Sequence, residues 1–243
     1  MIEKSMMQGE YVVMAKYDYV FMDVDNTLLD FDASERNALS DTLEQYGYPA
    51  TEESRGIYYR VNRPLWDAFE RGEITLDDIF AQRFQRFMEV VGGKHDPIAI
   101  NRFYVNQLKQ HVRVFPGAEE FCRSLFPFCT LAIVTNGGAL VQRARLEQSM
   151  LLPYFREVFI SGEIGYQKPR KEYFDHVCRE LSVQDRSRAV IFGDSLTSDM
   201  QGGINAGIDT MWFNPKKLPR GEVVPTWEVS DYATAASLIL EDQ

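Results

Sequence analysis

Residues 17–31 read YDYVFMDVDNTLLDF, and this stretch decides the predicted fold. Its first part is an almost continuous apolar run, which is typical of a strand that is buried on both faces. Asp23 and Asp25 stand where that run ends. Residues two apart share a face of a strand, and at a strand end the backbone can turn both carboxylates toward a cleft. The alternative is an ordinary turn or helix cap, where Asp and Asn are common.

Further apolar runs follow along the chain, and helix-length stretches separate them. The runs are residues 130–135, 157–161, 188–192 and 208–213, with a shorter one at 226–229. The helix-length stretches are residues 138–148, 170–181, 198–206 and 233–240. This alternation predicts an α/β fold, a doubly wound parallel sheet with helices on both faces. Right-handed crossovers then bring the carboxyl ends of neighbouring strands to one edge, where ligands bind.

The segment from residue 31 to residue 114 has a different pattern. It contains amphipathic stretches, separated by turn residues, that predict helices at 33–46, 52–70, 76–91 and 97–110. A segment of this length is not a simple crossover, so we expect an inserted helical subdomain. The predicted organisation is a Rossmann-like core at 16–30 and 115–243, a helical cap at 31–114, and an N-terminal extension at 1–15.

Polar residues follow two more of the predicted strands. Thr135 and Asn136 begin the sequence TNGG before a helix, where a hydroxyl and backbone N–H groups form an anion site. An ordinary N-cap is the alternative. Lys168 precedes Pro169 in the loop after the strand at 157–161. A lysine there can bind phosphate as a point charge, although most loop lysines are solvated.

Two further carboxylates follow the strand at 188–192, in the sequence FGDSLTSD. Asp194 and Asp199 supply the hard oxygen ligands that Mg²⁺ requires, although either one could instead cap the next helix. All of these groups fall at the carboxyl ends of predicted parallel strands, which favours one catalytic site over several unrelated structural roles. Arg143 and Arg145 are expected on a solvated face of the helix at 138–148.

These motifs resemble those of the haloacid dehalogenase-like (HAD) hydrolase superfamily, from about residue 16 onward. The resemblance implies a phosphatase in which Asp23 attacks phosphorus and forms an aspartyl-phosphate. It implies that Asp25 protonates the leaving oxygen and later activates water. Dehalogenases of the superfamily lack an acid at the position of Asp25, so phosphate esters are the expected substrates.

The resemblance also assigns the remaining core residues. Thr135 and the backbone of Asn136 would hold the phosphoryl oxygens, and Lys168 would neutralise charge on the nucleophile and the phosphoryl group. Asp23, the main-chain carbonyl of Asp25 and Asp194 would bind Mg²⁺ as the cofactor. Asp199 and Thr27 would support the site.

Residues 58–75, YYRVNRPLWDAFERGEIT, are the most informative part of the predicted cap. Asn62 and Trp66 lie one helical turn apart, so together they could hydrogen-bond and stack on a nucleobase. Packing of Trp66 within the core of the cap is the alternative. This stretch and GGINAG at 202–207 are similar to the pyrimidine 5′-nucleotidase branch, which implies a nucleoside monophosphate such as dUMP, dTMP or UMP as substrate.

Three other functions remain open at this stage. They are a phosphatase for phosphoglycolate or sugar phosphates, a phosphosugar mutase, and a catalytically silent binding module on the same scaffold. The silent module would predict loss of Asp23, Asp25, Lys168 or Asp194, and all four are present.

Composition limits the partners and the compartment. The 243 residues include 36 acidic and 26 basic side chains, and a formal charge of −10 disfavours nucleic acids and anionic membranes as partners. No apolar run at the start has the length of a signal peptide or a membrane span. Three cysteines without a CxxC pair predict a cytoplasmic protein. The sequence does not predict an oligomeric state.

Overall fold

The structure, a computed structural model, describes residues 15–241. The predicted extension at residues 1–15 therefore lies outside the described residues, except for Ala15. The carbonyl oxygen of Ala15 accepts a hydrogen bond of 2.9 Å from Arg188.

A six-stranded parallel sheet forms the centre of the molecule, in the order β3-β2-β1-β4-β5-β6. The strands are β1 (Tyr19–Met22), β2 (Thr130–Thr135), β3 (Glu157–Ile160), β4 (Ala189–Gly193), β5 (Asp209–Phe213) and β6 (Trp227–Val229). The predicted α/β fold is confirmed. Because β1 lies between β2 and β4, Asp23 stands at the middle of the carboxyl edge.

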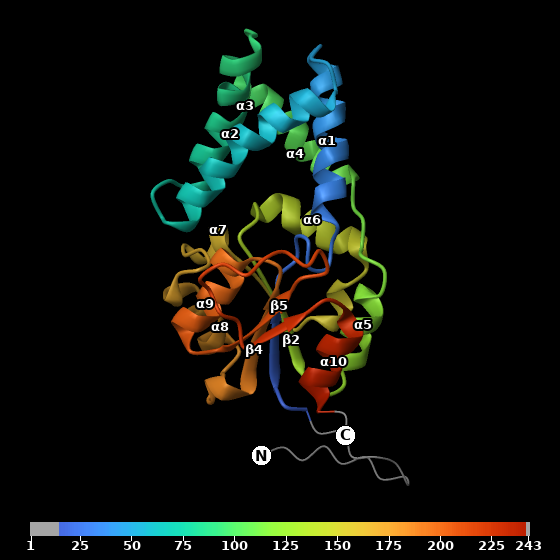
Figure 1. The fold of residues 1–243 in the computed structure, drawn as a ribbon, viewed down its shortest axis with the longest axis vertical. Helices are drawn as coiled ribbons and strands as arrows, with labels where there is room; N and C mark the ends of the chain where they lie inside the picture. Colours follow the sequence, from blue (N-terminus) through green and yellow to red (C-terminus); the bar gives the residue numbers. More distant parts are fainter. Residues whose placement is uncertain (1–14, 242–243) are drawn as a thin grey trace.

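Helices cover both faces of the sheet (Figure 1). Val20 and Met22 of β1 point to the face covered by α5 (Ala118–Leu125) and α10 (Tyr232–Leu240). Phe21 points to the opposite face, against α8 (Lys171–Glu180) and α9 (Gln201–Ala206). Each fully buried aliphatic or aromatic side chain contributes roughly 1.5–3 kcal/mol, so two apolar layers explain why these strands are apolar throughout.

Short elements at the carboxyl edge differ from the predicted ones. Ser161, predicted as the end of a strand, begins the short helix α7 (Ser161–Ile164). The helix predicted from residue 198 begins earlier, as the π-helix η3 (Leu196–Met200). The N–H groups of Asp199 and Met200 share the carbonyl oxygen of Ser195, and this widened turn is not visible in the apolar pattern. Helix α5 and the helices η1 (Leu152–Tyr154) and η2 (Arg186–Arg188) are additional to those predicted.

Four helices lie beyond the carboxyl edge of the sheet, on the far side of α6 (Ala139–Ser149) (Figure 1). They are α1 (Phe31–Gln45), α2 (Glu52–Glu70), α3 (Leu76–Val91) and α4 (Pro97–Gln110). Each begins at a residue whose side chain accepts a hydrogen bond from a first-turn N–H, namely Asp30, Thr51, Thr75 and Asp96. The helices enclose apolar side chains of their own, including Leu39, Tyr58, Phe84 and Tyr104.

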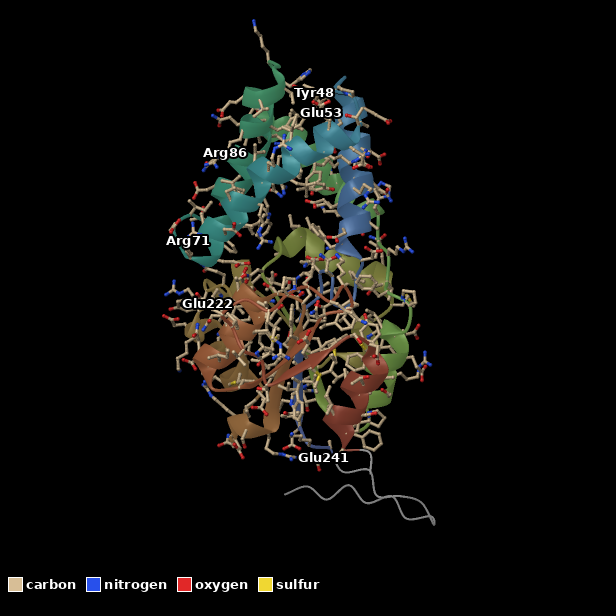
Figure 2. The ribbon with its side chains drawn as sticks, in the orientation of Figure 1. Tyr48, Glu53, Arg71, Arg86, Glu222 and Glu241 are labelled. Carbon is tan, nitrogen blue, oxygen red and sulfur yellow. The ribbon has the colours of Figure 1, made fainter. Side chains whose placement is uncertain are left out.

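The chain crosses between the two parts at adjacent points. Leu29 and Val114 form an antiparallel bridge, the N–H of Asp30 donates to Arg113 O at 2.8 Å, and that of Phe115 donates to Leu28 O at 2.9 Å. Figure 2 shows Arg71 at the end of α2 nearest the sheet, whereas Tyr48 and Glu53 lie at the opposite end of the helices. Within residues 15–241, no helix combines the length and the apolar character needed to cross a bilayer.

Candidate active site

Lys168 is the centre of a buried ion-pair network. Its ammonium group donates to Asp23 Oδ1 at 2.7 Å, to Asp199 Oδ1 at 2.6 Å and to the carbonyl oxygen of Val134 at 2.9 Å. Burial lowers the pKa of Lys168, but the charges of Asp199 and Asp23 outweigh burial and raise it above its ordinary value. The lysine therefore stays a cation next to the predicted nucleophile.

Three carboxylates gather beside that lysine. One oxygen each of Asp23, Asp194 and Asp199 lie within 4.8 Å of one another. Burial raises the pKa of Asp23 to about 7, with the charges of Asp199 and Asp25 adding to it and Lys168 opposing it. Burial and the charge of Asp23 likewise raise the pKa of Asp194. Such crowding is unfavourable without a further cation.

The hydrogen bonds separate the roles of these carboxylates. Asp199 uses one oxygen for Lys168 and the other for the N–H of Ser195 at 3.1 Å. Asp23 uses only Oδ1 for Lys168, and no side-chain hydrogen bond to Asp194 occurs among the described residues. Asp23 and Asp194 therefore offer the hard oxygen atoms that suit Mg²⁺, and Asp199 serves to fix Lys168.

Gly193 is required by this crowding. An added Cβ at Gly193 would overlap Asp199 Oδ2. Only glycine lets the end of β4 pass so close to the carboxylate that orients Lys168.

Asn136 and Thr135 contact the site in different ways. The side chain of Asn136 forms two hydrogen bonds of 2.9 Å with the backbone of Lys168, one to its N–H and one to its carbonyl oxygen. The hydroxyl of Thr135 accepts from the N–H of Gly137 at 3.2 Å and from Gln142 Nε2 at 2.8 Å. The side chain of Asn136 thus fixes the backbone of the loop that carries Lys168. The sequence predicted a role for the backbone of Asn136, but not this role for its side chain.

Asp25 is held by two residues of α6 that were not predicted as site residues. Gln142 Nε2 donates to Asp25 Oδ2 at 2.8 Å, and Arg145 Nη1 donates to Asp25 Oδ1 at 2.6 Å. Arg145 is only 1% exposed, so its expected place on a solvated face is wrong. Arg143 is exposed as expected and pairs with Glu163. The spacing of three between Gln142 and Arg145, which puts both on one helical face, is the signal that could have identified them.

The other predicted residues lie farther from this cluster. The side chain of Thr27 is buried and its hydroxyl has no hydrogen-bond partner among the described residues, while its carbonyl oxygen accepts from Tyr232. Trp66 lines a cavity that also reaches Asp25, and it packs edge-on against Phe69. Asn62 is buried within the helices and does not line that cavity.

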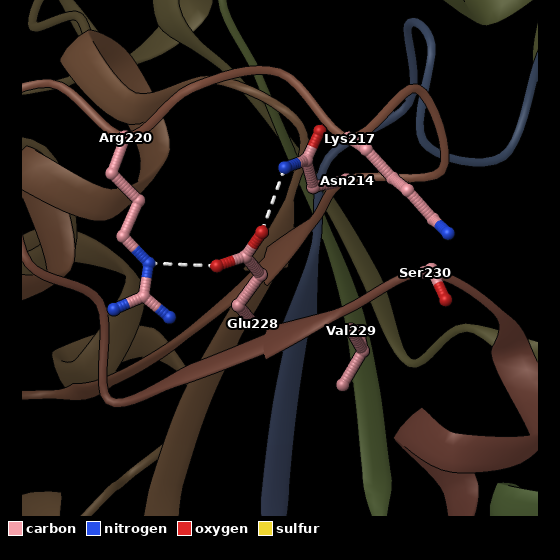
Figure 3. Close-up of a pocket in the computed structure, with 6 residues that line it drawn as sticks. All are labelled: Asn214, Lys217, Arg220, Glu228, Val229 and Ser230. Atoms are coloured by element: carbon pink, nitrogen blue, oxygen red, sulfur yellow. Dashed lines mark hydrogen bonds and ion pairs between the residues drawn. The ribbon is translucent and has the colours of Figure 1, made fainter.

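A larger, open hollow of about 400 Å³ lies at β5 and β6, away from this cluster (Figure 3). Its carboxylate, Glu228, already accepts hydrogen bonds from Asn214 and Arg220. None of the predicted catalytic residues lines this hollow, so the candidate site remains the cluster at the carboxyl ends of β1, β2 and β4.

The chain belongs to the haloacid dehalogenase-like hydrolase family, whose sequence profile matches residues 20–213. It is therefore an enzyme of the hydrolase class, and it shares the family's α/β fold.

Individual relatives match over most of the chain. The HAD-hydrolase YfnB of Bacillus subtilis is 37% identical over 217 residues, which cover 89% of this chain and 92% of YfnB. A YfnB structure, described as bound to magnesium and as revealing interdomain movement, superposes with a TM-score of 0.87 at 35% identity, covering 92% of this chain and 99% of the other. The pyrimidine 5′-nucleotidases PynA of Streptococcus pneumoniae and YjjG of Escherichia coli are each 35% identical, over 89% and 88% of this chain and 92% and 94% of their own.

Proposed function

We propose that this chain is a magnesium-dependent phosphatase that acts through an aspartyl-phosphate on Asp23, with pyrimidine nucleoside 5′-monophosphates as substrates. The observation that carries the proposal is the geometry of Asp23. One of its oxygens is fixed by Lys168 at 2.7 Å, while Asp194 lies beside it and Asp25 follows two residues later.

In the first step, a carboxylate oxygen of Asp23 attacks phosphorus, and the bond from phosphorus to the ester oxygen breaks. The leaving oxygen takes a proton from the protonated form of Asp25, whose two oxygens are in contact with Gln142 and Arg145. Lys168 reduces the repulsion between the nucleophile and the phosphate dianion. Thr135, which ends β2, and the backbone of the next residue, Asn136, would hold the phosphoryl oxygens.

In the second step, water attacks the phosphorus of the aspartyl-phosphate while Asp25 accepts its proton. Cleavage of the acyl-phosphate bond returns Asp23 as a carboxylate and releases inorganic phosphate. Asp25 thus regains the proton that it donated earlier, and the cycle is balanced.

Mg²⁺ fits the donor set at this site. Asp23 and Asp194 would hold it, with the main-chain carbonyl of Asp25, and the ion would neutralise phosphate charge during transfer. The raised pKa values of Asp23 and Asp194 support a requirement for an additional cation. The magnesium in the YfnB structure supports the same choice of ion.

The four helices α1–α4 are proposed to form the cap, which spans residues 31–114 and closes over the substrate. Their contacts with the core include hydrogen bonds of 2.8 Å from Thr197 to Glu70 and from Gln167 to the carbonyl oxygen of Phe69. The interdomain movement described for YfnB supports a cap that moves. The similarity to PynA and YjjG supports a pyrimidine nucleotide as the group that the cap selects.

A substrate panel tests the specificity. Phosphate release with Mg²⁺ would be measured for dUMP, dTMP and UMP against AMP, glycolate phosphate and hexose phosphates. We expect the pyrimidine nucleotides to have the highest kcat/KM. A preference for glycolate phosphate or sugar phosphates would agree with the proposed phosphatase mechanism but contradict the proposed nucleotide specificity.

The nucleophile is tested separately, with any phosphate ester that the protein hydrolyses. Asp23→Asn removes the attacking carboxylate, so we expect kcat to fall by at least about 10³-fold with the fold retained in circular dichroism. Asp18→Asn, at the exposed end of the same chain segment, is the matched control and should keep its activity. Appreciable turnover by Asp23→Asn would refute the proposed mechanism.

The compartment that we propose is the cytoplasm. The thiols of Cys122, Cys129 and Cys178 are free and buried, which supports a reducing environment.

A further inference from the structure

A cavity begins at Asp25 and extends between the core and the four helices. The core contributes Arg145 and Gln142 to its lining. The helices contribute aromatic rings and two ionisable groups, namely Phe31, Trp66, Phe80, Glu35 and Arg83. If Asp25 protonates the leaving oxygen, as proposed above, the leaving group must extend into this cavity. The inference below rests on that proposed function.

Arg83 provides an unused hydrogen-bond donor in the cavity. Its side chain is 3% exposed, and its Nε donates to Asn101 Oδ1 at 2.6 Å. Its guanidinium group also lies over the ring of Tyr104, at 4.6 Å from the ring centre. Nη2 is buried and has no partner among the described residues. A buried charged N–H without an acceptor is costly, so this nitrogen is expected to meet an acceptor on a ligand.

Glu35 provides a hydrogen-bond acceptor in the same cavity. One of its oxygens accepts the hydroxyl of Tyr104 at 2.9 Å. Glu35 and Arg83 both line the cavity, and among the described residues no ion pair joins them. The cavity therefore offers the Nη2 donor of Arg83 and the second carboxyl oxygen of Glu35 to a ligand.

We propose that Glu35 and Arg83 read the base of the nucleotide substrate by its hydrogen-bonding edge. Uracil and thymine have a ring N–H between two carbonyl groups, so the Glu35 carboxylate would accept the N–H and Arg83 Nη2 would donate to the carbonyl oxygen on C4, which cytosine replaces by an amino group. Cytosine has an acceptor nitrogen and an amino group at these positions, which places like groups against both residues. The rings of Trp66 and Phe80 provide flat surfaces on which such a base packs.

The cavity would have to widen to admit a base. Its volume is about 50 Å³, which holds water molecules but no pyrimidine ring. Glu35 is on α1 and Arg83 is on α3, so displacement of the helices would widen the cavity while keeping the two residues together. Phe80 lies at the boundary, where it would be 3.1 Å from a Cβ added at Gly138.

The deciding experiment compares dUMP with dCMP in wild-type protein and in Glu35→Gln at pH 8.5, where Glu35 is a carboxylate because burial raises its pKa only to about 7. The amide of glutamine has nearly the same shape but can donate a hydrogen bond to the ring nitrogen of cytosine. We expect the ratio of kcat/KM for dUMP to that for dCMP to fall by about tenfold or more, mainly through KM. A ratio within about twofold of wild type would overturn the proposal. Because the comparison is internal, partial loss of folded protein does not affect it.

Arg83→Met gives a second test with a matched control. We expect it to lower kcat/KM for dUMP by about tenfold or more, while turnover of deoxyribose 5-phosphate, which lacks a base, changes little. Arg86→Met, on the same helix but outside the cavity lining, should behave as wild type (Figure 2). Equal losses with both substrates would assign Arg83 to the stability of the cap and contradict base reading. If Arg83→Met does not fold, the ratio in Glu35→Gln decides alone.

The wild-type panel separates this inference from the proposed function. If the wild type prefers dUMP but Glu35→Gln leaves the ratio of kcat/KM for dUMP to that for dCMP unchanged, the nucleotidase function is supported and the proposed role of Glu35 and Arg83 is contradicted. A wild type that hydrolyses only base-free phosphate esters would reject both.

Discussion

At the scale of single residues, Lys168 contacts several of the groups that form the candidate site. It is 1% exposed, and it neutralises two buried carboxylates at once. The side chain of Asn136 fixes the position of Lys168 by hydrogen bonds with its N–H and its carbonyl oxygen. A buried cation with two buried anions contributes little net stability when complete, but removing one member leaves charge uncompensated.

Lys168→Met is therefore expected to lower the free energy of unfolding by about 3–5 kcal/mol at pH 7 and to abolish turnover. Urea unfolding followed by circular dichroism measures the stability loss. Lys171→Met removes an exposed lysine that pairs with Asp175, and it should cost less than about 1 kcal/mol. Similar stabilities for the two variants would contradict the role of Lys168.

Glu35 is expected to make stability depend on pH. Burial raises its pKa to about 7 from 4.5, against the opposing effects of the Tyr104 hydrogen bond and Arg83, while Asp32 and Asp25 add to the rise. Tyr58, on α2, also lies close to this group. The folded protein then holds the proton more tightly than the unfolded chain, so the stabilisation is complete below about pH 4.5 and is lost as pH rises through about 7.

Glu35→Gln should remove this dependence. Between pH 5 and pH 8, we expect the free energy of unfolding of the wild type to fall by about 1–3 kcal/mol relative to that of the variant. The value is smaller than the full effect of the pKa shift because Glu35 is partly exposed. Urea unfolding at intervals of one pH unit measures the difference. Glu44→Gln, on the exposed face of the same helix, is the control and should give a curve parallel to that of the wild type. A parallel curve for Glu35→Gln as well would contradict the pKa shift of Glu35.

At the scale of elements, the strand ends were predictable because each follows an apolar run covered on both faces. Asp23 and Asp194 follow β1 and β4, Thr135 is the last residue of β2, and their convergence follows from parallel topology alone. Lys168 was predictable only as a loop residue after β3. The spacing of three places Gln142 and Arg145 on one face of α6, but that this face meets Asp25 was not predictable, because it depends on how α6 is rotated against β1.

The four helices α1–α4 show the same limit. The bounds of α2, α3 and α4 agree with the prediction and those of α1 differ by at most two residues, since turn residues and apolar periodicity mark each end. Their relative packing decides that Glu35 and Arg83 meet in one cavity while Asn62 does not, and residues so distant in sequence leave no periodic signal.

The end of β4 gives a prediction at this scale. Gly193→Ala would force the new methyl group into the Asp199 carboxylate, so we expect a loss of about 1–3 kcal/mol in the free energy of unfolding and a larger loss of activity. Gly162→Ala, on α7, has no atom within 4 Å of the added Cβ and serves as the control. Thermal unfolding and kcat of the two variants test this, and an active, fully stable Gly193→Ala would show that Asp199 can move without consequence.

For the whole molecule, we expect the excess of buried carboxylates to couple folding to metal binding. A cation bound at Asp23 and Asp194 would relieve their repulsion in the folded state only. Mg²⁺ should therefore stabilise the wild type relative to EDTA, by about 1.4 kcal/mol for each tenfold excess over Kd. Asp194→Asn should lose most of this gain, whereas Glu180→Gln, an exposed change, should keep it. An equal effect of Mg²⁺ on the melting temperatures of all three proteins would place the ion elsewhere.

The bridge between Leu29 and Val114 has a consequence for how such enzymes diversify. The chain leaves the core and returns to it at two positions that face each other across one antiparallel pair, about 5 Å apart. Any helical module whose two ends lie equally close could be exchanged at this junction without disturbing the register of β1 or the position of Asp23. The gene for such a protein can thus be recombined at two fixed points, and a lineage can acquire a new specificity while inheriting its chemistry unchanged.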